Sequence, residues 1–174
     1  GVGNEAYIEF CPQATLEKEL KNYPHLAIIR TLSKAFALAG LRCGFVLANS
    51  ELIQILSKVI APYPIPVPSA DIAEQALQAE NIALVQARAQ EILANRQWLA
   101  EALFALPQVE NVYHSEANYL LIKCQDGERV FKALLEQGII LRDQNKALNL
   151  QNCIRITVGT KEENLSVINA ISRG

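Results

Sequence analysis

The chain has 174 residues, 51% of them hydrophobic and 20% charged, which is the composition of an ordinary globular protein with a buried core. Its formal net charge of −2 gives no long-range attraction to phosphate backbones or anionic lipid, so neither nucleic acid nor a membrane is an expected partner. The longest apolar runs are broken by Pro or Gly and the chain opens without a charged-then-apolar leader, so we expect a soluble cytoplasmic protein.

The first 62 residues are typical of the end of an α/β domain. Short apolar runs, partly β-branched, predict buried strands of a parallel sheet. These runs lie at residues 6–10, 26–31 and 43–48. The residues between the last two runs are helix-prone but too few for a full crossover helix. Ser50, with Glu51 after it, predicts a capped helix that continues to about residue 60.

Four prolines between residues 61 and 68 predict a hinge, because proline fixes φ and removes a backbone donor. We therefore expect a domain boundary after residue 62, with residues 63–174 forming the hinge, a long helix and a small α+β domain. Apolar residues at spacings of three, four and seven predict the long helix, which starts near Ser69 and ends before Pro107. The later predicted elements are strands at 109–114 and 119–123, a helix at 128–137, strands at 139–142 and 154–158, and a helix at 161–172.

The four cysteines are isolated in largely apolar surroundings and show no CxxC spacing, which favours buried thiols over disulfides or a zinc site. They are Cys11, Cys43, Cys124 and Cys153. The two histidines are far apart in the sequence, so no metal is expected.

The most informative stretch runs from Thr31 to Gly44, because it places Lys34 directly after a predicted buried strand. An ammonium group is hard to solvate there, and the neutral amine is the form that makes a Schiff base with a carbonyl. Ser33 offers a hydroxyl and Arg42 a planar cation, which together suit a phosphate. The residues alone leave a second interpretation open, a surface lysine beside a structural arginine.

The string RTLSKAFALAGLRCGF, from Arg30 to Phe45, resembles the cofactor-lysine motif of fold-type I pyridoxal-phosphate (PLP) aminotransferases. It is similar to the histidinol-phosphate aminotransferases in particular, and so are IILRDQNK at 139–146 and CIRITVGT at 153–160. The resemblance covers essentially the whole chain, but only the second half of a family member. It implies a fold-type I α/β protein that is truncated to the end of the large parallel-sheet domain and the complete small α+β domain.

The resemblance assigns cofactor roles to several residues. Lys34 would form the internal aldimine with PLP and then move a proton between the substrate carbon and the cofactor carbon. Ser33 and Arg42 would hold the cofactor phosphate, and Tyr7 would hydrogen-bond the phenolic oxygen of the ring. The family has an Asp-Glu-Ala-Tyr pattern in which the aspartate pairs with the protonated pyridine nitrogen, whereas this chain has Asn4 there. A neutral amide would hold that proton less well and weaken the electron sink.

The resemblance also implies a reaction and a substrate site. Arg155 would bind the carboxylate of glutamate or the phosphate of histidinol phosphate, with Arg142 close by as a second cation. Without the family, a salt bridge at a strand end is the favoured interpretation of both arginines. The implied activity is amino transfer between L-histidinol phosphate and 2-oxoglutarate or glutamate in histidine biosynthesis, by a homodimer of the full-length protein.

Three alternatives remain open. An aromatic-amino-acid aminotransferase and a threonine-phosphate decarboxylase share the lysine motif. A non-catalytic structural domain, which keeps the fold without the chemistry, is supported by Asn4. Because the resemblance places part of the large domain outside this chain, we expect the chain alone to be inactive or nearly so, and its unpaired strand edges to favour self-association.

Overall fold

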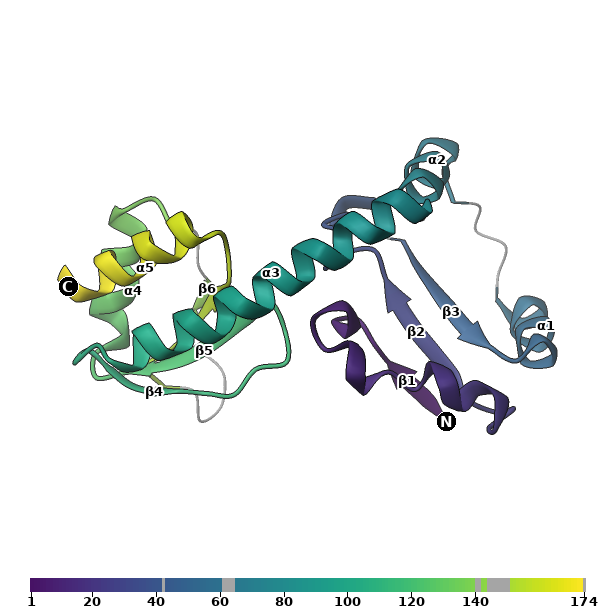
Figure 1. Cartoon of the computed structure of the whole chain (residues 1–174), viewed down its shortest axis with the longest axis horizontal. Helices are drawn as coiled ribbons and strands as arrows, with labels where there is room; N and C mark the ends of the chain where they lie inside the picture. The colour runs from purple at the N-terminus through teal and green to yellow at the C-terminus, as the bar shows by residue number, and fades with distance from the viewer. Residues whose placement is uncertain (42, 61–64, 140–141, 144–150, 174) are drawn as a thin grey trace. The chain divides into compact units, whose positions relative to one another are not determined.

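The computed structural model describes residues 1–41, 43–60, 65–139, 142–143 and 151–173, with the backbone alone at residues 41, 142 and 143. These residues form two compact units, Gly1–Ala89 and Gln90–Gly174 (Figure 1). The units divide within one long helix, α3 (Ala79–Phe104). The domain boundary that the sequence predicts after residue 62 lies within residues 61–64, outside the described residues, and stays a prediction.

The N-terminal unit contains a sheet of three strands in the order β1 (Val2–Asn4), β2 (Ala27–Thr31) and β3 (Gly44–Ala48). β1 pairs with β2 in parallel, whereas β3 runs antiparallel to β2. The sheet is therefore mixed, and the sequence prediction of a purely parallel one is wrong at β3. A hydrophobic run of five residues carries no information about strand direction, which the connection between the strands decides.

The strand predicted at residues 6–10 is also wrong. The backbone N–H of Ala6 donates to Oδ1 of Asn4 at 3.2 Å, and this local bond turns the chain just after β1. Residues 8–10 then form a 3₁₀ turn, η1 (Ile8–Phe10), that places Phe10 in the core at 2% exposure. The apolar residues of this segment are thus buried by a turn and not by a strand. Two more 3₁₀ turns follow, η2 (Pro12–Ala14) and η3 (Glu17–Lys21).

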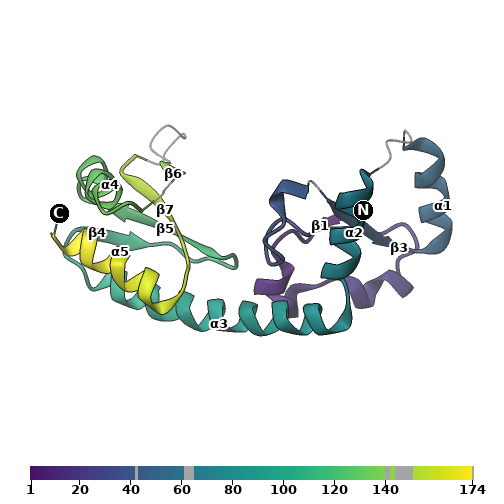
Figure 2. The same ribbon diagram turned by 90° about the horizontal axis from the view of Figure 1, so that it is seen from above.

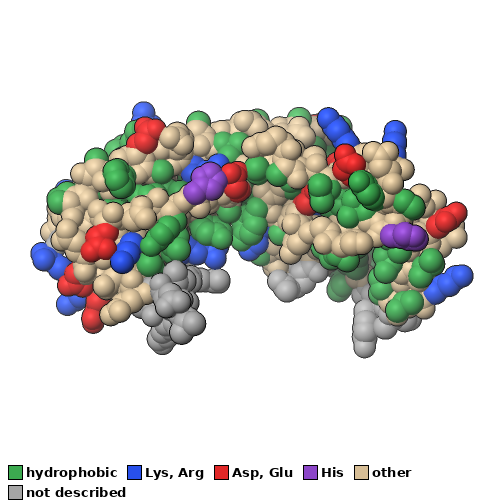
Figure 3. Space-filling model, turned by 90° about the horizontal axis from the view of Figure 1, so that it is seen from below, with side chains coloured by type: hydrophobic (Ala, Val, Ile, Leu, Met, Phe, Trp, Pro, Cys, Tyr) green, Lys and Arg blue, Asp and Glu red, His purple; other side chains and the backbone are tan. Residues whose placement is uncertain are grey.

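One face of this sheet is covered and the other is open. Ile28 is fully buried, whereas Ile29 and its register partner Val46 are 44% and 37% exposed. Side chains alternate between the two faces of a strand, so the second face presents apolar residues to the solvent. Figure 3 shows hydrophobic side chains at the surface of the chain.

The helices of the N-terminal unit begin at clear local signals. α1 (Ser50–Val59) starts after Asn49, whose Oδ1 accepts the backbone N–H of Glu51 at 3.0 Å, so the N-cap is Asn49 and not the predicted Ser50. α2 (Val67–Ala76) carries Pro68 in its first turn, where a missing N–H costs nothing. The long helix predicted from Ser69 is divided into α2 and α3 by a turn at residues 77–78. Between β2 and β3 lies a short 3₁₀ turn, η4 (Ala39–Leu41).

The C-terminal unit contains an antiparallel sheet in the order β4-β5-β7-β6. The strands are β4 (Val109–Val112), β5 (Tyr119–Cys124), β6 (Arg142–Asp143) and β7 (Cys153–Thr157). α4 (Gly127–Glu136) and α5 (Lys161–Arg173) complete the unit, and Figure 2 shows β5 next to β7 in it. These elements match the predicted α+β order.

The core of the C-terminal unit lies on one face of that sheet. Alternate residues of β5 and β7 point into it, among them Ile122 and Ile154, both fully buried. Leu99 and Leu103 on α3 and Ile171 on α5 pack against them. The intervening residues of β5 and β7 therefore lie on the opposite face, which carries the predicted substrate arginine.

Within the described residues, no helix is long and apolar enough to cross a membrane. The same residues hold no group of three His, Cys, Asp or Glu side chains placed to bind a metal ion. All four cysteines are free thiols; Cys11, Cys124 and Cys153 are buried as predicted, whereas Cys43 is half-buried.

Candidate active site

The predicted cofactor residues lie in two turns at one edge of the N-terminal sheet. Because β1 and β2 are parallel, the segments that leave their carboxyl ends start from the same edge. Tyr7 lies in the turn after β1 and Lys34 in the turn after β2. Nζ of Lys34 lies over the Tyr7 ring, 5.4 Å from its centroid. The fold thus brings together two side chains that are 27 residues apart in the sequence. Lys34 is exposed, so the expectation that its ammonium group is hard to solvate is wrong for this chain.

Hydroxyl groups shape the turn that carries Lys34. The hydroxyl of Thr31 donates to Oγ of Ser33 at 2.9 Å, and the backbone N–H of Ser33 donates to Oγ1 of Thr31 at 3.1 Å. The backbone N–H of Ala37 closes the turn on the carbonyl oxygen of Lys34 at 3.0 Å. Ala37 has φ of 54°, a left-handed conformation that is costly for a residue with a Cβ and that persists only where the surroundings impose it.

Asn4 ends β1 and its side-chain oxygen is engaged by the backbone of Ala6, as described above. The carbonyl side of this amide therefore faces its own turn. A carboxylate at the same position could accept the same bond, so the replacement of Asp by Asn changes the charge and keeps the local geometry.

Two of the predicted site arginines cannot be placed. Arg42, the predicted phosphate ligand, lies outside the described residues. The backbone of Arg142 is described in β6, but its side chain is not. Their roles stay predictions.

Arg155 lies on β7, on the sheet face away from the hydrophobic core. Its guanidinium carbon lies 3.8 Å from the centroid of the Tyr119 ring, a cation–π contact between β7 and the neighbouring β5. In the backbone pairing of β6 with β7, Arg142 is the register partner of Arg155.

Tyr119 contacts the predicted substrate arginine, and the sequence analysis did not identify it. Tyr119 and Arg155 are neighbours on one sheet face because of the register of β5 against β7. Only this strand pairing could have identified Tyr119. Arg155 and Lys34 belong to different compact units.

A charged network at the base of the two turns was also missed. The Glu5 carboxylate is buried, at 7% exposure of the residue, and accepts hydrogen bonds from three residues. They are the backbone N–H of Leu16 at 2.7 Å, the hydroxyl of Thr15 at 3.1 Å and Nε of Arg30 at 3.0 Å. Both charged residues stand inside the strings that resemble the family, Glu5 between Asn4 and Tyr7 and Arg30 at the start of the lysine motif.

Glu9 lies near this network and lines a hollow of about 290 Å³ in the N-terminal unit, together with Arg30, Phe36 and Phe45. Burial raises the pKa of Glu9 above its ordinary value, an effect that its own backbone and Arg30 oppose and that Glu5 reinforces. Among the described residues, Oε2 of Glu9 is buried without a hydrogen-bond partner. This carboxyl is therefore held in surroundings that favour its protonated form.

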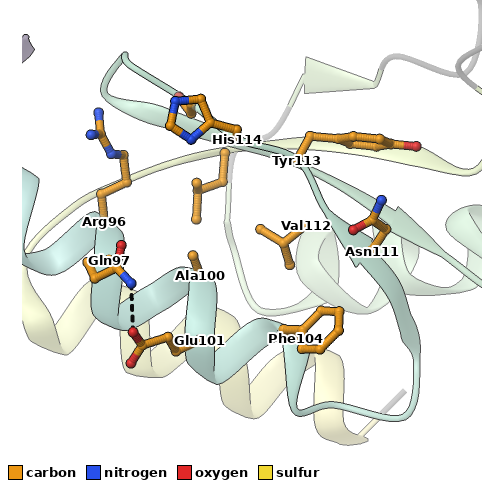
Figure 4. Close-up of a pocket in the computed structure, with 11 residues that line it drawn as sticks. Arg96, Gln97, Ala100, Glu101, Phe104, Asn111, Val112, Tyr113 and His114 are labelled. Atoms are coloured by element: carbon orange, nitrogen blue, oxygen red, sulfur yellow. Dashed lines mark hydrogen bonds between the residues drawn. The ribbon is translucent and has the colours of Figure 1, made fainter.

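The C-terminal unit has a more open hollow of about 410 Å³ between α3 and β4. Figure 4 shows Gln97, Ala100 and Phe104 along the α3 side and Asn111, Val112 and Tyr113 along the β4 side. None of the predicted site residues whose side chains the structure describes lines this hollow.

Comparisons with known proteins agree with this geometry. The family described as aminotransferase class I and II matches residues 2–171. Histidinol-phosphate aminotransferase of Haemophilus influenzae (strain PittEE) is 78% identical over 170 residues, which are 98% of this chain and 48% of that protein. The chain thus spans about half the length of the curated relatives that it matches.

Solved structures show the same fold. The histidinol-phosphate aminotransferase from Clostridium acetobutylicum has a TM-score of 0.83 at 25% identity, over 99% of this chain and 53% of that one. The histidinol-phosphate aminotransferase from Sinorhizobium meliloti, solved in complex with pyridoxal-5'-phosphate, has a TM-score of 0.78 at 24% identity, over 99% of this chain and 47% of that one. The predicted fold class is confirmed, as part of an α/β domain followed by a smaller α+β unit. By its match from residue 2 to residue 171, the chain belongs to the class I and II aminotransferase family.

Proposed function

We propose that the whole protein transfers an amino group between L-histidinol phosphate and 2-oxoglutarate or glutamate, with PLP as its cofactor. The observation that carries the proposal is the position of Lys34 over the Tyr7 ring, at the edge of the sheet where β1 and β2 end. The choice of substrate is supported by the name of relatives that are 78% and 66% identical to this chain. A homodimer and a cytoplasmic location belong to the same proposal and rest on the family resemblance.

The described residues fit PLP in most respects. A primary amine and a phenol meet at Lys34 and Tyr7. Oγ of Ser33 accepts the Thr31 hydroxyl, which leaves the Ser33 hydroxyl able to donate to a phosphate oxygen. Asn4, Tyr7, Ser33, Lys34 and, by sequence alone, Arg42 would hold the cofactor.

PLP, when bound, supplies an electron sink for the carbon that loses its proton. Lys34 would be the attachment point and the base that moves this proton, because a flexible primary amine is suited to both tasks. Tyr7 would donate a hydrogen bond to the phenolic oxygen of the cofactor ring. Arg155 would bind the carboxylate or phosphate of the substrate with two parallel N–H groups. Its contact with the Tyr119 ring orients the guanidinium plane.

Asn4 favours a second candidate function, a domain that keeps the fold with weakened chemistry. The amide cannot hold the pyridine nitrogen protonated as a carboxylate does. Because the chain spans about half of its relatives' length, we further propose that it does not turn over histidinol phosphate by itself.

Site-directed labelling tests the role of Lys34 without requiring turnover. The chain is mixed with PLP at increasing concentration, reduced with borohydride, digested and mapped by mass spectrometry. We expect Lys34 to be modified at lower PLP concentration than Lys58, an exposed lysine on α1 that serves as the control. A Lys34→Arg variant identifies the peptide. Equal modification of the two lysines over the whole range would contradict the proposed cofactor site.

A further inference from the structure

We propose that Glu5 is a positioning residue, which acts through Arg30 and Thr15 to hold the Tyr7 turn and the Lys34 turn side by side. The inference rests on the proposed function, in which Tyr7 and Lys34 contact the cofactor. Glu5 is not one of the residues proposed to contact the cofactor, and its role is to position two residues that do.

Glu5 is the point where the two turns are joined. The backbone pairing of β1 with β2 extends one residue beyond β1, to the bond from the Glu5 N–H to the carbonyl oxygen of Ile29 at 2.8 Å. The chain then turns towards Tyr7, two residues after Glu5. The neighbouring strand β2 ends at Thr31, one residue after Arg30, and the chain turns there towards Lys34. The side chains of Glu5 and Arg30 thus meet where the sheet ends and the two turns begin.

The Glu5 carboxylate is held by several hydrogen bonds. Both Nε and Nη2 of Arg30 lie 3.0 Å from Oε2 of Glu5, while Oε1 accepts the backbone N–H of Leu16 at 2.7 Å. The Thr15 hydroxyl lies 3.1 Å from both carboxylate oxygens. Both carboxylate oxygens of Glu5 thus accept hydrogen bonds, and the side chain is only 6% exposed. The carboxylate is therefore held in a single orientation.

The other contacts of the Arg30 guanidinium group are more exposed to solvent. Nη2 also donates to Oγ1 of Thr15 and to Oε2 of Glu17, each at 3.0 Å, but the Glu17 side chain is 56% exposed. Glu17 therefore contacts the same guanidinium group from the solvent side. Its pairing with Arg30 does not involve the Glu5 carboxylate. This makes Glu17→Gln a matched control, because it removes a negative charge from the same arginine without releasing the buried carboxylate.

The test uses the ring current of Tyr7 as a measure of the Lys34 position. Protons of the Lys34 side chain over the Tyr7 ring are shifted upfield in the NMR spectrum of the lysine-labelled chain. A Tyr7→Leu variant gives the unshifted reference, and Lys34→Arg identifies the signal by removing it. We expect Glu5→Gln to lose most of the upfield shift, Thr15→Val to lose part of it and Glu17→Gln to keep it.

A purely stabilising ion pair would give a different result. In that case Glu5→Gln would lower stability, but the Lys34 shift of the folded molecules would equal that of the unaltered chain, and this result overturns the proposal. If Glu5→Gln does not fold, as judged by the loss of the buried Ile28 methyl signals, the milder Thr15→Val decides in the same way. The measurement needs no cofactor, so a failure of PLP to modify Lys34 would refute the proposed function and leave this result standing.

Discussion

The substitution Glu5→Gln should destabilise the N-terminal unit far more than the loss of a surface ion pair does. The Glu5 and Arg30 side chains are 6% and 18% exposed, so the substitution leaves a mostly buried guanidinium group without its main counter-charge. Breaking a buried pair from one side costs about 3 to 5 kcal/mol. Arg30 keeps Glu17 and Thr15 as partners, which places the expected cost at the lower end, at about 3 kcal/mol.

The comparison pair is Lys123 with Glu110 in the C-terminal unit, where the charged atoms are 3.5 Å apart and the side chains are 45% and 44% exposed. Such a pair contributes roughly 0 to 1 kcal/mol, so Glu110→Gln should have little effect. Hydrogen exchange followed by mass spectrometry reports each unit separately. A loss of about 3 kcal/mol corresponds to roughly hundredfold faster exchange of the best-protected β2 amides. If Glu5→Gln accelerates exchange in β2 no more than Glu110→Gln does in β4 and β5, the Glu5–Arg30 pair does not stabilise the unit as a buried pair should.

Two further predictions concern buried ionisable groups. Burial raises the pKa of Glu9 above 4.5, so the folded state favours the protonated carboxyl, and its contribution to stability is full below about pH 4.5 and is lost as the pH rises through the raised pKa. Glu9→Gln should therefore stabilise the N-terminal unit at about pH 7 and have little effect at about pH 4, and urea unfolding that shows no such difference would count against it. Burial raises the pKa of the Cys124 thiol to about 11, whereas Cys43 is only half-buried. Iodoacetamide at about pH 8 should label Cys43 well before Cys124 by peptide mapping, and equal rates in the folded chain would refute this.

The C-terminal unit could be predicted well from the sequence because its strands have a strict alternation. In β5, Leu120, Ile122 and Cys124 are buried and the residues between them are not, which is the period of a strand with one covered face. The first strand of the N-terminal sheet, β1, had no such signal. Val2-Gly3-Asn4 is a weak strand sequence, and it is a strand because β2 lies beside it to pair with.

The candidate site could be predicted only as far as local sequence reaches. The lysine motif identified Lys34 and Ser33, because the turn that carries them is built from adjacent residues. The contacts of Lys34 with Tyr7, of Arg30 with Glu5 and of Arg155 with Tyr119 join residues that are 25 or more positions apart. Such contacts depend on strand order and register, which a single sequence does not specify.

Asn4 and Glu5 are adjacent in the sequence but affect different properties of the candidate site. Asn4 affects its charge, and Glu5 affects the positions of its side chains. Asn4 takes part in the same local turn that a carboxylate would make, so under the proposed function its effect is confined to the missing negative charge. Glu5, the next residue, keeps every contact of the buried network that joins the two turns. Under the proposed function, Glu5 holds the Lys34 turn beside the Tyr7 turn, whereas Asn4 changes the charge that would face the cofactor and leaves the local geometry unchanged.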